Sequence, residues 1–310
     1  MREICYYYSS PKTAYKIWLN RPINLLLTEQ LLIMRAYKYM KFSCFCLVFL
    51  CTISTTAQKK INKDIYKSVK KSIQFLSGEQ SDMEYSVYAV YHYLERLYKI
   101  QPISSDTFFI EKIALIDSNS FSRLEPFFCL TRTSMPNTSY LNRYEKNALD
   151  YYMVQTLACN VLKLEDDFLD KIETLSDVSN YELTHSYLIL QWLKEGNCAN
   201  VDTQKLNKLQ VSLKRKLLTL LRSKNNNWDD VYLEALAFLC YTDGKKYIRT
   251  RWLNAIIQHQ MPNGGWKHFA QNSDSSAHPT VFALWVMLAY QQKTALSVKW
   301  IYPNTNNPQK

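Results

Sequence analysis

Three short segments of the sequence bring imidazole, carboxylate and hydroxyl side chains to the expected starts of helices. Such groups can bind a metal ion or carry out general acid and base chemistry. The segments contain Glu182, Thr184 and His185; Asp229, Asp230 and Glu234; and Asp274, Ser275 and His278. From these we select four candidate catalytic residues: Asp229, Asp230, His185 and His278.

Aromatic residues in the apolar stretches that follow could form the wall of a ligand site. The candidates are Tyr187, Trp192, Tyr232 and Trp285. An aromatic face can attract a cation, stack on a sugar ring, or fill a hydrophobic core. The sequence leaves these three alternatives open.

Asp166, Asp167 and Asp170 spell D-D-x-x-D, the pattern of enzymes that bind magnesium and diphosphate. The pattern lies in the polar segment LEDDFLDKIE and has no second partner motif. We therefore interpret it as an exposed charged helix face.

The composition excludes several cofactor folds. Only five of the 310 residues are glycine, and the one adjacent pair is Gly264-Gly265. A P-loop or a dinucleotide fingerprint needs several glycines in one stretch, so neither can be present. No CxxC spacing occurs, which excludes a zinc ribbon. We therefore expect no cofactor and no dedicated metal site. The small number of glycines also favours a helical fold over one with many tight β-turns.

From about residue 140 the apolar pattern alternates between two kinds of helix. Stretches that are apolar nearly all round predict buried inner helices, and stretches with one apolar stripe predict outer helices. Gly78, Gly196 and Gly244 each follow such a stretch and are expected to end it in the left-handed conformation. The inner stretches cover 148–162, 186–193, 231–240 and 281–290, with an earlier candidate at 83–100. The outer stretches cover 202–224 and 245–258, and 102–140 is expected to hold loops and shorter helices.

Alternating inner and outer helices build either a solenoid or a closed α/α toroid, and one motif favours the toroid. Gln260-Met-Pro-Asn-Gly264-Gly265-Trp266 resembles the Q-x-x-x-G-x-W repeat of terpenoid cyclases and related prenyltransferase-like toroids. The resemblance is strong over about 225–292 and weaker over about 140–292. It implies an all-α toroid, possibly an incomplete ring. In the motif, the glycines would permit a tight turn, Trp266 would pack on neighbouring helices, and the Gln260 amide would satisfy free N–H groups at a helix start.

The resemblance also suggests roles for particular residues. Asp230 and His278 fall near the zinc-binding Asp and His of protein prenyltransferases, but Tyr232 stands where that family has a zinc-binding Cys. Asn227-Trp228-Asp229-Asp230 is similar to the D-x-D-D acid motif of class II cyclases, with Asp229 at the place of the proton donor and Asn227 in place of the first Asp. Because Tyr232 replaces the zinc-binding Cys, zinc-dependent prenyl transfer is not expected.

The amino-terminal region has the anatomy of a secretory signal peptide. Residues 42–51 are apolar, a basic stretch precedes them, and small residues end at Ala57. We expect translation to start at Met34 or Met40, cleavage after Ala57, a toroid domain over 58–302 and a polar tail over 303–310. An exported chain is not expected to bind nucleic acid or to keep a membrane anchor, and its location would be periplasmic or extracellular. Export permits disulfides among Cys129, Cys159, Cys198 and Cys240, with the pairing open.

Together these patterns predict an exported toroid protein with a ligand site at the rim formed by the inner-helix starts. A small molecule of isoprenoid or glycan type could bind there. The sequence leaves open whether the protein is an enzyme, a glycan-acting lyase or hydrolase among them, or a non-catalytic binding or scaffold protein.

Overall fold

The computed structural model describes residues 60–79, 84–103, 144–146, 148–159, 162–196, 198, 200–223, 228–269, 273–292 and 298–301. The expected leader, signal peptide, cleavage site and polar tail lie outside these residues, as does nearly all of 102–140. Contacts within the chain define two units, Met1–Ile61 and Asn62–Lys310. Only residues 60 and 61 of the first unit are described, so the fold below is that of the second.

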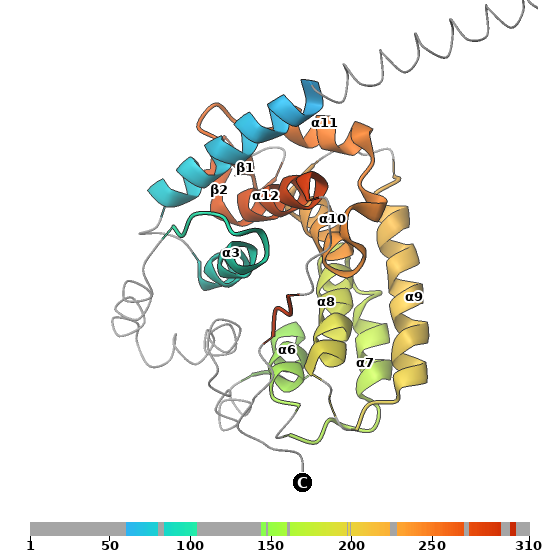
Figure 1. The fold of residues 1–310 in the computed structure, drawn as a ribbon. Coiled ribbons are helices and arrows are strands. Elements are labelled where there is room, and N and C mark those ends of the chain that lie inside the picture. Colours follow the sequence, from blue (N-terminus) through green and yellow to red (C-terminus); the bar gives the residue numbers. More distant parts are fainter. Residues whose placement is uncertain are drawn as a thin grey trace, which may run out of the picture. The chain divides into compact units, whose positions relative to one another are not determined.

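Helices make up most of the described structure, which confirms the predicted all-α class (Figure 1). Among the described residues the one sheet has two strands, β1 (Trp266–Lys267) and β2 (Ser275–Ser276), paired antiparallel. No described helix is both long and apolar enough to cross a membrane. Residues 60–78 are helical, and the further helices are α3 (Tyr85–Tyr98), α6 (Leu149–Leu157), α7 (Phe168–Leu175), α8 (Asn180–Gly196), α9 (Thr203–Leu220), α10 (Asp230–Asp243), η2 (Gly244–Tyr247), α11 (Thr250–Gln258) and α12 (Ala277–Gln291).

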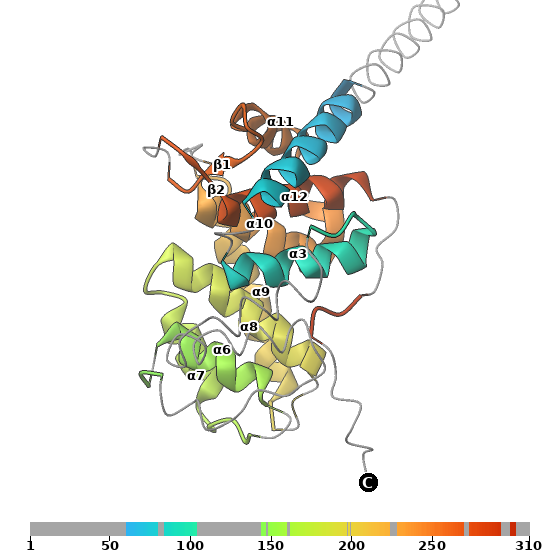
Figure 2. The ribbon, with the colours of Figure 1, turned by 90° about the vertical axis from the view of Figure 1, so that its left-hand side faces the viewer.

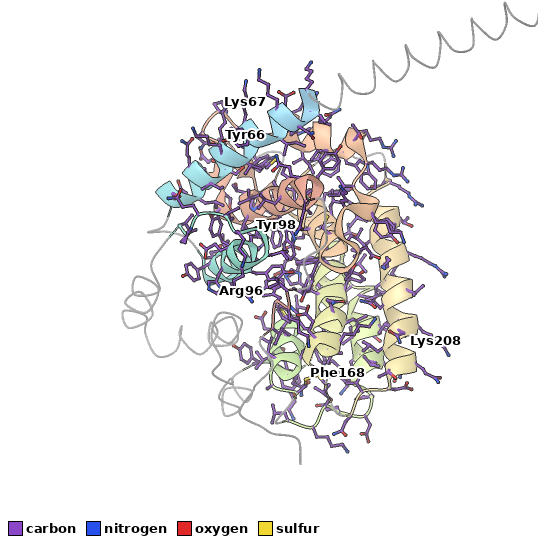
Figure 3. The ribbon with its side chains drawn as sticks, viewed as in Figure 1. Tyr66, Lys67, Arg96, Tyr98, Phe168 and Lys208 are labelled. Atoms are coloured by element: carbon purple, nitrogen blue, oxygen red, sulfur yellow. A yellow bond between two sulfur atoms is a disulfide. The ribbon has the colours of Figure 1, made fainter. Side chains whose placement is uncertain are left out.

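Burial follows the two kinds of apolar pattern. In α12 every residue from Pro279 to Ala289 is buried, as expected for a helix that is apolar all round. In α9 the buried residues include Leu206, Leu209, Leu213 and Leu217, which form one stripe. Lys208 lies on the opposite side of that helix and points away from its neighbours (Figure 3). The predicted alternation of buried and striped helices is therefore confirmed for these elements.

The buried helices pack in a consistent order of neighbours. Helix α6 contacts α8, α8 contacts α10, and α10 contacts α12. Helix α12 also contacts α3, although the two are far apart in the sequence (Figures 1 and 2). The striped helices α7 and α9 contact α8, and α11 contacts α12, so each covers a buried helix.

The predicted helix caps are present at some helix boundaries and absent at others. Asp229 accepts a hydrogen bond from the Tyr232 N–H at the start of α10, as a capping Asp should. Gly244 ends α10 with φ of 59°. The left-handed conformation expected at Gly78 and Gly196 is wrong, because positive φ among described glycines occurs only at Gly244 and Gly264.

Helix α8 begins earlier than its apolar pattern predicted. The Ser179 hydroxyl accepts hydrogen bonds from the Tyr181 and Glu182 N–H groups, so the first residue of the helix, Asn180, lies six residues before the predicted stretch 186–193. His185 therefore lies in the second turn of α8 and not at its first residue.

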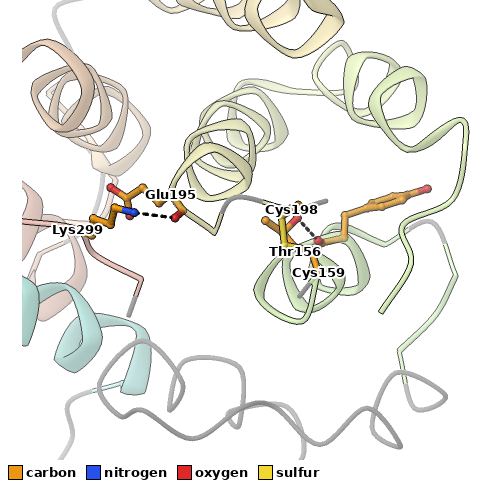
Figure 4. The surroundings of a disulfide bond; sticks show 6 residues. Thr156, Cys159, Glu195, Cys198 and Lys299 are labelled. Carbon is orange, nitrogen blue, oxygen red and sulfur yellow. Dashed lines mark hydrogen bonds between the residues drawn. A yellow bond between two sulfur atoms is a disulfide. The ribbon is translucent and has the colours of Figure 1, made fainter. Parts of the chain in front are cut away.

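A disulfide joins Cys159 to Cys198 and ties the chain after α6 to the chain after α8 (Figure 4). Gly196 lies against it, since a Cβ there would stand 3.4 Å from the Cys159 sulfur. Cys240 is buried and free, and Cys129 lies outside the described residues. The structure thus gives one disulfide pairing, which the sequence had left open.

The motif from Gln260 to Trp266 fastens α11 and α12 to the helix over 60–78. The Gln260 amide donates to the Ser68 carbonyl oxygen at 3.0 Å and to the Gly264 carbonyl oxygen at 2.9 Å, and its oxygen accepts from the Ser68 hydroxyl at 2.6 Å. The predicted bond of Gln260 to a helix start is therefore wrong, because its partners are Ser68, in the middle of a helix, and Gly264, in the turn after α11. Trp266 is fully buried and its indole N–H donates to the Ile256 carbonyl oxygen.

Candidate functional site

A cavity of about 480 Å³ lies among the buried helices. Side chains from α3, α6, α8, α10 and α12 and from the carboxyl-terminal segment 298–301 form its wall, so the elements that line it are far apart in the sequence. Its polar lining residues are Glu84, Ser86, Asp150, Tyr181, His185 and His278, and its aromatic lining residues are Trp192, Phe238, Phe282 and Trp300.

His278 is fixed in this wall by a carboxylate from the neighbouring helix. Its Nδ1 lies 2.7 Å from Oδ1 of Asp230, whose side chain is only 5 % exposed. The contact forms because α10 begins at Asp230, α12 begins one residue before His278, and the two helices pack together. Asp230 and His278, expected to meet from their positions alone, are therefore in direct contact.

The other ring nitrogen of His278 faces a second, fully buried carboxyl. Its Nε2 lies 3.8 Å from Oε1 of Glu234, which is beyond hydrogen-bond distance. The Thr184 hydroxyl donates to Oε2 of Glu234 at 2.8 Å, and Nδ1 of His185 lies 3.7 Å from the same oxygen. The Glu234 carboxylate thus lies near the imidazoles of both His185 on α8 and His278 on α12.

The electrostatics of the cluster favour a charged imidazole. Burial alone lowers the pKa of His278, but the hydrogen bond and charge of Asp230, with the charges of Glu234 and Glu84, raise that pKa to about 9. Burial raises the pKa of the Glu234 carboxyl, against the opposing effect of His185 and His278. Hence His278 carries a proton near neutral pH, and its Nε2–H is directed at no acceptor within hydrogen-bond distance in the described structure.

His268 joins this cluster from the loop after β1, a contact that the sequence did not reveal. Its Nδ1 lies 3.3 Å from Oδ2 of Asp230, and its carbonyl oxygen accepts the Asp230 N–H at 3.2 Å. The β1–β2 pairing turns the chain so that His268 reaches α10. The one signal in the sequence was that His268 follows the Gln260–Trp266 motif closely. That motif predicts a turn, but it does not predict which helix the residues after the turn will contact.

Three members of the cluster could share one metal ion. Asp230, His268 and His278 each offer a ligand atom, and these atoms all lie within 4.8 Å of one another. Two imidazoles and one carboxylate are a ligand set that zinc accepts, with a fourth position left for water or substrate.

The other predicted site residues are spread over the fold. Asp229 caps α10 and does not line the cavity; burial raises the pKa of its carboxyl. Of the four aromatic candidates, Trp192 lines the cavity. Tyr187 is fully buried and its hydroxyl contacts that of Thr242, whereas the Tyr232 hydroxyl contacts that of Ser223. Trp285 packs among Tyr93, Tyr241, Phe282 and Trp300.

The D-D-x-x-D residues form surface ion pairs. Asp166 pairs with Lys163 at 3.5 Å, Asp167 with Lys171 at 3.1 Å, and Asp170 with Lys205 at 2.6 Å. All three carboxylates are more than half exposed. They form the charged outer face expected from the sequence, and none of them lines the cavity.

The carboxyl-terminal segment 298–301 closes one side of the cavity. Trp300 lies in the cavity wall and is 2 % exposed. The Glu195 carboxylate accepts the N–H groups of Trp300 and Ile301 at 3.0 and 3.2 Å, and its backbone carbonyl accepts from Lys299 (Figure 4). Arg96 donates to the carbonyl oxygens of Lys299 and Trp300, both at 3.1 Å. These bonds fix the indole ring in position.

Comparison of the chain with protein-family models, with curated proteins and with solved structures found no match.

Proposed function

We propose that this chain is an exported α/α-toroid protein that binds a small organic molecule in the 480 Å³ cavity, with His278 as the main polar contact. The observation that carries the proposal is the position of His278. Its Nδ1 is held by Asp230, while its Nε2–H has no acceptor at bonding distance in the described structure. A ligand oxygen that enters the cavity would supply that acceptor.

The packing order of the helices supports a toroid. In a ring of helix pairs, the first inner helix lies beside the last, and the contact between α3 and α12 is of this kind. Side chains from α3, α6, α8, α10 and α12 face one cavity, as inner helices of a ring would. The resemblance of the Gln260–Trp266 motif to the toroid repeat points the same way.

The disulfide supports export. Disulfides persist in oxidising compartments and are rare in the bacterial or eukaryotic cytosol. A bond between Cys159 and Cys198 therefore agrees with the signal-like sequence that ends at Ala57. Amino-terminal sequencing of the secreted or periplasmic protein tests this, and a first residue far from Gln58 would contradict the cleavage site.

Tryptophan fluorescence can test the binding proposal, because Trp192 and Trp300 lie in the cavity wall. Farnesol and cellobiose serve as probes for the isoprenoid and glycan classes. We expect saturable binding of one of them, weakened roughly 10- to 100-fold by His278→Ala, since a hydrogen bond from a charged group contributes about 1.5–3 kcal/mol.

The matched control for this experiment is His259→Ala. His259 is exposed, and its imidazole contacts the Ala255 carbonyl oxygen of the same helix turn, so its removal should leave binding unchanged. Circular dichroism would establish that both variants are folded. Wild-type affinity in folded His278→Ala, or no saturable response to either probe, would contradict the proposal.

A second candidate function, metal-dependent chemistry, is favoured by the closeness of Asp230, His268 and His278. After treatment with a chelator, the protein is expected to bind Zn²⁺, and Co²⁺ as a coloured substitute, in a 1:1 complex. His268→Ala should weaken that binding at least about tenfold because it removes a ligand.

His185→Ala is the control for metal binding, since His185 is in the same network but outside the three-residue set. Visible absorption of the Co²⁺ complex and metal analysis provide the readouts. Equal metal binding by the His268→Ala and wild-type proteins would exclude this set as the site.

A further inference from the structure

A second pocket, of about 290 Å³, lies between the end of α9 and the start of α11. It shares no lining residue with the cavity that holds His278. Its wall consists of Leu221, Arg222, Ser223, Trp228, Arg251, Trp252 and Ala255.

The charged groups that line this pocket are all positive. Arg222 and Arg251 contribute two guanidinium groups, and the lining contains no acidic residue. Neither arginine forms an ion pair with a carboxylate within the part of the chain that the structure describes. An arginine guanidinium carries its charge at every physiological pH and presents several N–H donors in one plane. The pocket is therefore rich in donors that lack a matching anion.

The aromatic ring of Trp252 orients the basic groups. The guanidinium carbon of Arg251 lies 5.9 Å from the centre of this ring, and that of Arg249 lies 5.0 Å from it. Stacking on an indole ring leaves the edge of a guanidinium group, where its N–H donors lie, open to another partner. Trp252 itself is buried, which gives the two arginines a rigid support.

The start of α11 adds to the positive potential. Arg249 is the N-cap residue, its side chain makes no capping bond, and the first turn contains no acidic residue. A helix start of this kind carries a partial positive charge and unpaired backbone N–H groups. Arg251 belongs to this first turn and also lines the pocket.

The pocket wall also contains a polar group that lacks a partner. The indole N–H of Trp228 is buried and has no acceptor among the described residues. Trp228 as a whole is 7 % exposed, and a buried donor without an acceptor is uncommon in folded proteins. An oxygen-rich ligand in the pocket, with a small shift of the ring, would supply that acceptor.

We propose that this pocket is a binding site for an oxyanion, a phosphate or sulfate group, held by Arg222 and Arg251 against the Trp228 and Trp252 walls. Tetrahedral oxyanions match the planar guanidinium donors and accept several hydrogen bonds at once. The group could be a free ion or belong to a larger molecule such as a sugar phosphate or sugar sulfate. This site does not depend on the function of the His278 cavity.

Calorimetric titration at constant ionic strength tests the proposal. The probes are inorganic phosphate, inorganic sulfate, glucose 6-phosphate and glucose 6-sulfate. We expect saturable binding of the phosphate and sulfate probes, weakened roughly tenfold by Arg222→Gln or Arg251→Gln and more by both together. The indole N–H resonance of Trp228, assigned with Trp228→Phe, should shift on binding. A sugar ester that binds more tightly than its free ion would identify the larger molecule as the source.

Arg215→Gln is the matched control, because Arg215 is exposed on α9 and does not line the pocket. Arg251→Lys keeps the charge but loses the planar donors, so it should retain only part of the affinity. The absence of saturable binding would overturn the proposal. Equal weakening by Arg215→Gln and Arg251→Gln would also overturn it, since that result would indicate general surface charge.

Discussion

Gly264→Ala is expected to lower the free energy of unfolding by about 3 kcal/mol or more, the sum of backbone strain and overpacking. Gly264 has φ of 100°, a conformation that residues with a Cβ rarely adopt. A Cβ at this position would also lie 2.4 Å from the carbonyl oxygen of Lys71. That oxygen belongs to the helix over 60–78 and cannot move without displacing the helix. Urea unfolding followed by circular dichroism measures the loss.

Substitutions at two other glycines distinguish the cost of backbone strain from the cost of steric overlap. Gly244 has φ of 59° but no atom within 4 Å of a Cβ, so Gly244→Ala should cost only the strain, about 1–2 kcal/mol. Gly78 has neither feature, and Gly78→Ala should be neutral or slightly stabilising. If the Gly264 and Gly244 variants lose the same stability, the close approach to Lys71 is not important.

The adjacent glycines Gly264 and Gly265 explain why the motif indicates a fold and not an activity. Gly265 is restricted as well, since a Cβ would lie 2.6 Å from that of Ser275 on β2. Gln260 bonds to Ser68 across the same contact. The motif therefore joins the helix over 60–78 to α11 and α12, so its residues serve packing, and none of them lines the cavity.

Local patterns predicted the helices because burial and periodicity are encoded by neighbouring residues. The stripe of α9 and the all-apolar face of α12 could be read directly. The start of α8 could not, because the Ser179 cap lies in a polar stretch with no apolar period. Left-handed glycines were overestimated because a helix can also end without one, as at Gly196.

Part of the site was predictable from polar residues near the starts of buried helices. Asp230 and His278 were selected as polar residues before two inner helices, and packing of α10 on α12 brings them to 2.7 Å. Glu84, Asp150 and His268 enter the site through contacts between distant segments. Nothing in their local sequence specifies those contacts, which depend on how the helices and the β1–β2 turn are arranged.

Trp300→Ala is expected to lower the free energy of unfolding by about 3–5 kcal/mol, the usual cost of removing a buried aromatic side chain. Trp300 lies near the end of the described chain, yet its ring packs against four others. The ring-centre distances are 5.2 Å to Tyr93, 5.5 Å to Trp192, 5.5 Å to Trp285 and 5.7 Å to Tyr241. Because the indole also forms part of the cavity wall, its removal should enlarge the cavity as well.

Urea unfolding of Trp300→Ala, Trp300→Phe and Phe269→Ala tests this role. Trp300→Phe keeps a ring in the cluster and should retain most of the stability, whereas Phe269 is 44 % exposed and its truncation should cost little. A loss in Trp300→Ala no larger than in Phe269→Ala would mean that segment 298–301 leaves its place at little cost, and that the bonds from Arg96 and Glu195 do not hold it. A large loss would instead show that this segment is part of the core. Its packing would then hold in place the part of the cavity wall that a bound ligand contacts.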